Sequence, residues 1–251
     1  MNKKAVILTQ LIQQLKLLAI FIGFYILFLI GATGIEKMTT LNVSFDGISY
    51  VLVMYLVVFT WMSFLTNITL YSYHSYSRKT ILNRTVIVQL IISFISSLLI
   101  EAHNLLMTYI PFFSFIEPDD SVRVVYTNQL TSQEGLRYVL SIIFVTLVIF
   151  SVLLLTDLVL IATYSMRKRT VIIILFTLLV LILGALFSLP YWSKEMLSLM
   201  ITVLGFVSGT GQSIVPSIVI PAILLVLVGV ISYFISLKLV KKLEVHKSIF
   251  I

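Results

Sequence analysis

A row of polar residues runs along one stretch of this chain that is otherwise apolar. Gln89, Ser93, Ser97, Glu101 and Asn104 are separated by four, four, four and three positions. Residues three and four apart share one face of an α-helix, so this spacing predicts one polar face along most of a helix. A polar face in lipid turns toward protein or water. The row therefore predicts either a partly hydrated pathway or close packing between helices.

Two other polar features lie in neighbouring apolar stretches. A shorter row, Thr60, Ser63, Asn67 and Tyr71, has the same helical spacing, so we expect a pathway or a subunit interface between these two helices. Asp157 lies near the end of a third stretch, where it either lines the pathway or pairs with a basic residue. For Glu101 the alternatives are a functional role or ion pair, and a side chain that reaches the membrane surface.

Motifs for catalysis were sought in the same sequence. There is no cysteine, no G-x-S-x-G, no H-E-x-x-H, and no glycine followed by lysine, which removes the P-loop for ATP. His103 is two residues from Glu101 and so points in another direction. We therefore expect this chain to have no catalytic residue, no metal site and no cofactor of its own.

The elements that must position these residues are long apolar helices. The chain has 251 residues, of which 60% are hydrophobic and 11% charged, against about 25% charged in soluble domains. A membrane-spanning helix needs about 20 apolar residues. The sequence predicts an all-α polytopic membrane protein, a single domain over residues 1–251 with six transmembrane helices. The expected spans are residues 17–35, 47–70, 86–110, 138–162, 171–189 and 218–237.

Three segments outside these spans have a composition that predicts a specific structure. Residues 1–16 mix apolar and basic residues at helical spacing, which favours an amphipathic interfacial helix over a frayed terminus. Residues 71–85 form the largest internal loop, rich in aromatic and basic residues, with a potential short helix. Residues 190–217 contain an apolar run too short to span, followed by glycines, which predicts a re-entrant hairpin between the fifth and sixth helices.

The formal charge of +7 is distributed according to topology and does not indicate nucleic-acid binding. If both termini are cytoplasmic, 13 of the 17 basic residues lie on the cytoplasmic side, as the positive-inside rule requires. We therefore expect a multi-pass protein of the cytoplasmic membrane with both termini inside. The cytoplasmic basic residues are Lys3, Lys4, Lys16, Arg78, Lys79, Arg84, Arg167, Lys168, Arg169, Lys238, Lys241, Lys242 and Lys247.

The layout of residues 1–16, 71–85 and 190–217 around six spans resembles the membrane subunits of small bacterial export-type ABC transporters. Within that family it is most similar to permeases of staphylococcal exporters of amphipathic peptides, the phenol-soluble modulins. The resemblance implies a pathway formed with a second permease subunit, and ATP and Mg bound on a separate cytoplasmic ATPase subunit. It also implies that residues 71–85 couple to that subunit. The contact residues would be Tyr73, His74, Tyr76, Arg78 and Lys79.

Two other functions fit the same residues. One is an immunity or sensor protein that binds a toxic peptide without ATP, and dependence on an ATPase partner distinguishes it from the exporter. The other is a proton-coupled carrier that uses Glu101, which predicts dependence on a pH gradient and loss of activity in Glu101→Gln.

Overall fold

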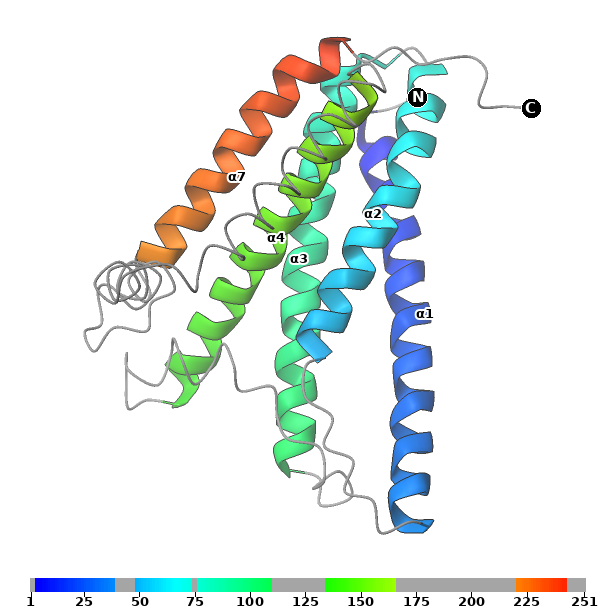
Figure 1. The fold of residues 1–251 in the computed structure, drawn as a ribbon, viewed down its shortest axis with the longest axis vertical. Coiled ribbons are helices and arrows are strands. Elements are labelled where there is room, and N and C mark those ends of the chain that lie inside the picture. The colour runs from blue at the N-terminus through cyan, green and yellow to red at the C-terminus, as the bar shows by residue number, and fades with distance from the viewer. Residues whose placement is uncertain (1–2, 39–47, 74–75, 110–133, 166–219, 243–251) are drawn as a thin grey trace, which may run out of the picture. The chain divides into compact units, whose positions relative to one another are not determined.

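The computed structural model describes residues 3–38, 48–73, 76–109, 134–165 and 220–242, and every regular element in these ranges is helical. This confirms the all-α class. The helices are shown in Figure 1. They are α1 (Lys3–Met38), α2 (Ile48–Tyr73), α3 (Arg78–Tyr109), α4 (Glu134–Ser165), α7 (Ile220–Leu239) and the short 3₁₀ helix η5 (Val240–Lys242).

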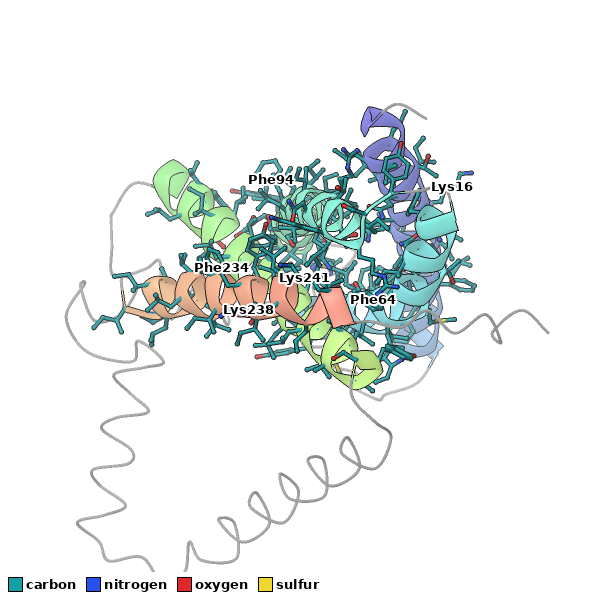
Figure 2. The ribbon with its side chains drawn as sticks, turned by 90° about the horizontal axis from the view of Figure 1, so that it is seen from above. Lys16, Phe64, Phe94, Phe234, Lys238 and Lys241 are labelled. Carbon is teal, nitrogen blue, oxygen red and sulfur yellow. The ribbon has the colours of Figure 1, made fainter. Side chains whose placement is uncertain are left out.

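Five of the described helices are long and apolar enough to cross a membrane. They coincide with the first, second, third, fourth and sixth expected spans. In lipid a helix satisfies all its backbone hydrogen bonds within one segment, which is why long apolar stretches fold this way. Figure 2 shows Phe94 of α3 and Phe234 of α7, which are both exposed. The fifth expected span and the re-entrant hairpin, residues 171–189 and 190–217, lie outside the described residues.

The first helix is longer than the span expected within it. We expected an interfacial helix over residues 1–16 and a span from residue 17, but α1 continues from Lys3 to Met38 without a break at that boundary. Its 36 residues correspond to about 54 Å at about 1.5 Å per residue, against a hydrocarbon core of about 30 Å. One helix is therefore long enough to hold both an interfacial part and a transmembrane part.

The segment 71–85 is mostly helical, and the expected short helix within it is the beginning of α3. Helix α2 ends at Tyr73 and α3 begins at Arg78, eight residues before the start expected for the third span. Ser77 explains this start, because its Oγ accepts a hydrogen bond from the backbone N–H of Thr80 at 3.2 Å, as an N-cap residue does. Charged and polar residues follow it, which is why apolar patterning alone placed the start too late.

The chain divides into two compact units, residues 1–153 and 154–251, with the boundary inside α4. In unit 1, α3 packs against both α1 and α2. Two side-chain contacts, Gln10 with Thr85 and Tyr25 with His103, show that α1 and α3 run in the same direction. We call the end where α1 and α3 begin and α2 ends the proximal end of unit 1. The opposite end, where α1 and α3 end and α2 begins, is the distal end.

The core of unit 1 is a continuous apolar cluster. Leu18 of α1, Leu52 and Leu56 of α2, and Ile92 and Ile100 of α3 are buried in it. The first part of α4 adds Val145, Ile149 and Leu153 to the same cluster. Four helices therefore share one core in this unit. The polar rows lie on two of these helices, α2 and α3.

Unit 2 contains the last part of α4, with α7 and η5. The buried residues of α7 fall on one face, where Gly229, Ser232 and Ser236 are spaced by three and four positions. Small residues at this spacing let membrane helices approach closely. Asp157 of α4 is the buried carboxylate of this unit among the described residues.

Candidate functional site

All five residues of the polar row on α3 are buried. Gln89, Ser93 and Ser97 have no exposed surface, and Asn104 and Glu101 are 2% and 3% exposed. The row therefore faces protein along its whole length, as the spacing predicted. Glu101 is therefore enclosed by protein near the distal end of the row.

The shorter row on α2 is buried as well. Thr60, Ser63, Asn67 and Tyr71 are all at most 9% exposed and continue the face that carries Leu52 and Leu56 nearer the distal end. Toward the proximal end the buried face of α2 thus gains polar side chains, although apolar residues remain buried there as well. Tyr71 lies beyond the membrane-spanning part of α2, and burial raises the pKa of its phenol because the charged form loses solvation.

One residue of the α3 row makes a direct contact with α4. The hydroxyl oxygens of Ser97 and Thr146 are 2.7 Å apart, and either can donate. Each hydroxyl also lies within hydrogen-bond distance of a carbonyl in its own helix, that of Phe94 for Ser97 and that of Ile142 for Thr146. We expected a pathway or a subunit interface between the second and third helices. The row on α3 also joins α3 to α4.

Several buried polar atoms near the proximal end and the middle of unit 1 have no hydrogen-bond partner among the described residues. They include the hydroxyls of Ser93 and Ser96 on α3 and the side-chain oxygens of Gln10 and Gln14 on α1. Gln10 uses its other amide atom, Nε2, in a 3.5 Å contact with Thr85. Buried polar atoms in proteins normally have partners, and water or a polar ligand supplies them when protein does not. This region is therefore suited to hold water or polar groups.

We call this region the proximal polar face. It consists of buried or half-buried polar side chains on three helices of unit 1 that share one core. Its members are Gln10 and Gln14 on α1, Thr60, Ser63 and Asn67 on α2, and Gln89, Ser93 and Ser96 on α3.

The distal half of unit 1 contains a polar pair that the sequence did not reveal. The Tyr25 hydroxyl and His103 Nε2 are 2.6 Å apart, which joins α1 to α3, and the two rings meet edge to face. Phe21 stacks on Tyr25 and also contacts the ring of Tyr55. His103 was expected to point away from Glu101, and it faces α1. Periodicity places a residue on a helix face but does not say which helix lies opposite.

The expected ATPase-contact residues gather at the turn between α2 and α3. Tyr73 is the last residue of α2, Tyr76 lies in the connection, and Arg78 and Lys79 begin α3, while His74 lies outside the described residues. Arg78 is half-buried and Lys79 exposed.

The turn is held by local contacts. The backbone N–H of Tyr76 donates to the carbonyl of Tyr71 at 3.1 Å, which satisfies an end carbonyl of α2. The guanidinium of Arg84, a residue we had not expected at this site, lies 5.8 Å from the centre of the Tyr76 ring. Tyr76 therefore contacts both the end of α2 and the beginning of α3.

Asp157 belongs to unit 2. Its side chain is 1% exposed, on the part of α4 that also carries the fully buried Leu160 and Ile161. Within the described ranges, no group of three or more histidine, cysteine or acidic residues is arranged to hold a metal ion.

The described residues form a helical protein with five helices long and apolar enough to span a membrane and with polar residues buried between them. Comparison with protein-family models, with curated proteins and with solved structures returned no match to this chain. The argument for a function therefore depends on the residues described above.

Proposed function

We propose that this chain is the membrane subunit of an ATP-driven exporter of amphipathic peptides or other hydrophobic molecules, driven by a separate ATPase subunit. A second permease subunit completes the pathway. The observation that carries the proposal is the continuity of α3. This helix begins at the turn with Arg78 and Lys79 and carries the polar row from Gln89 to Asn104. A displacement of the turn is therefore transmitted along one helix to the polar row.

The turn is well suited to meet a soluble partner. Helix α3 has 32 residues, about 48 Å at about 1.5 Å per residue, while the hydrocarbon core is about 30 Å thick. One or both ends of α3 therefore extend beyond the hydrocarbon, unless the helix is strongly tilted. The basic residues at its beginning favour the cytoplasmic side, where ATP is available. The N-cap of Ser77 and the contact of Arg84 with Tyr76 stabilise the shape of this surface.

The proximal polar face supports a pathway in the same unit. An exporter of amphipathic molecules needs a route that accepts polar groups within the depth of the membrane. Ser93 and Ser96 provide buried hydroxyls without protein partners among the described residues, and Asn67 and Gln89 provide amide groups on α2 and α3. Opening of these helices during a transport cycle would expose this polar surface to the cargo.

The test is co-purification of a tagged chain from its native membrane in mild detergents. We expect a stoichiometric soluble protein that carries a P-loop. The double variant Arg78→Glu with Lys79→Glu should lose this partner while the membrane domain stays folded, because two charges are reversed at the proposed contact.

A matched control reverses the same charge elsewhere. Lys238 in α7 and Lys241 in η5 are exposed and are also expected on the cytoplasmic side, and Figure 2 labels both. The variant Lys238→Glu with Lys241→Glu should retain the partner. Equal retention in both double variants would overturn the coupling assignment, and absence of any ATPase from the folded wild-type chain would overturn the exporter.

A proton-coupled carrier is the second candidate, and the burial of Glu101 favours it. Glu101 is 3% exposed within a helix that is long and apolar enough to span the membrane, and an acidic residue at such a position is typical of proton pathways in carriers. Glu101→Gln should then abolish pH-gradient-driven uptake in vesicles without an ATPase. Transport that requires ATP and continues in Glu101→Gln would exclude this candidate.

A further inference from the structure

A cavity of about 240 Å³ lies between α1, α2 and α3 in the distal half of unit 1. Its wall is built almost entirely from aliphatic and aromatic side chains. Those that define its shape are Phe21 and Ile22 of α1, Leu52 of α2, and Leu99, Ile100 and Met107 of α3. Among the described residues, no charged side chain lines it. All its lining residues lie within the parts of these helices that are apolar enough to cross a membrane.

The polar groups in the wall are already engaged. The hydroxyl of Tyr25 and the ring of His103 contact each other at 2.6 Å, and His103 is 8% exposed. A water molecule in a cavity needs two to four polar partners, and this wall offers few. Water is therefore a poor occupant. If the cavity were empty, its lining side chains would lack the van der Waals contacts that an apolar group supplies.

The cavity opens sideways onto the surface that faces the hydrocarbon. Ile26, Ile30 and Leu106 line it and are each about half exposed, and Ala102 lines it beside them. Its wall therefore continues into the exposed apolar surface of α1 and α3, and the described residues at this opening are apolar. An apolar group that already lies in the bilayer can enter without crossing water.

We propose that this cavity binds one acyl chain of a membrane lipid. The volume decides between apolar occupants. A cavity of about 150 Å³ accepts a benzene ring, so 240 Å³ holds a stretch of one hydrocarbon chain. A helical peptide is about 10–12 Å wide and does not fit. The site is thus separate from the proximal polar face, and it remains even if the exporter proposal fails.

Photolabelling tests the site. The full chain is reconstituted in phosphatidylcholine vesicles that contain a small fraction of phosphatidylcholine with a diazirine on one acyl chain, and labelled residues are mapped by mass spectrometry. We expect label at Ile22, Leu99 and Ala102 several times above that at Phe94 and Leu98. The last two are exposed on α3 but do not line the cavity.

Two variants fill the cavity from opposite helices, Ala102→Phe from α3 and Ile22→Trp from α1. Each should reduce labelling of the cavity to the level of Leu98. The control Leu98→Phe enlarges an exposed side chain about one turn earlier on α3 and should leave cavity labelling unchanged. Unchanged labelling in both filled variants that remain folded, or even labelling of all lipid-facing residues, would overturn the proposal.

A competition arm separates a lipid chain from a peptide side chain. An excess of an unlabelled amphipathic helical peptide should leave lipid labelling of the cavity intact. If the peptide removes the label, and a photoreactive phenylalanine in that peptide labels Leu99 or Ala102, the cavity binds the peptide and the lipid assignment is wrong.

Discussion

The proximal and distal halves of unit 1 are built from the same three helices but differ in the chemistry of their buried faces. Near the distal end, Leu29, Leu52 and Met107 are buried and a cavity opens among apolar side chains. Toward the proximal end the buried positions carry glutamine, serine, threonine and asparagine in addition to apolar residues. The contrast is clearest on α1 and α2, because the buried polar row of α3 continues into the distal half as far as Asn104.

We relate the difference between the two halves to two roles: packing between helices in the distal half and transport in the proximal half. Helices in lipid associate through van der Waals packing and hydrogen bonds, because lipid is as apolar as leucine and supplies no hydrophobic drive. The distal half has that packing. The proximal half buries polar atoms, and burial of polar atoms without hydrogen-bond partners costs free energy. Their presence therefore favours a role in which water or cargo reaches them.

The largest effect expected on stability comes from the packing of the distal half. Leu52→Ala removes a side chain that is 2% exposed in the core of unit 1 and should cost about 2–5 kcal/mol of unfolding free energy. Leu98→Ala, at an exposed position of α3, is the control and should cost far less. Unfolding in detergent micelles measures both. Equal costs would mean that the distal half is not packed as described.

A smaller effect is expected from the polar pair of the distal half. Tyr25→Phe leaves the buried His103 ring without its 2.6 Å partner and should cost about 1–3 kcal/mol. The same change at the exposed Tyr109 should be neutral. The double variant Tyr25→Phe with His103→Leu should cost less than the sum of the single variants. Simple additivity would show that the contact contributes nothing.

The smallest effect concerns the contact between α3 and α4. A double-mutant cycle of Ser97→Ala and Thr146→Val should give a coupling of about 0.6 kcal/mol, typical of hydrogen bonds between membrane helices. Both hydroxyls retain a carbonyl acceptor in their own helix, which keeps the coupling low. A coupling several times larger would place the polar row among the main stabilising elements and weaken its assignment to a pathway.

The sequence predicted the helices and the buried polar row because both follow from the cost of polar groups in lipid. Gln89, Ser93, Ser97, Glu101 and Asn104 share one face by their spacing alone, and that face is buried. The apolar pattern did not show that the short helix expected within residues 71–85 is continuous with the third span, because the residues after Ser77 are polar.

The partners of these residues could not be predicted from one helix at a time. The contacts of Ser97 with Thr146 and of Tyr25 with His103 join segments 49 and 78 positions apart. The cavity depends on the packing of three helices, which no single stretch of sequence encodes. For the same reason the sequence placed both polar rows between the second and third helices, although the row on α3 also reaches α4.

The central claim is that the proximal polar face meets water during the working cycle and that the distal core does not. Because the chain has no cysteine, single cysteines report cleanly on access. Ser93→Cys and Leu52→Cys are compared in native membrane vesicles with a water-soluble thiol reagent, which reacts with thiolates formed in water. The account predicts that Ser93→Cys is modified when ATP is supplied and that Leu52→Cys stays unmodified. Equal protection of both cysteines in every condition would contradict it.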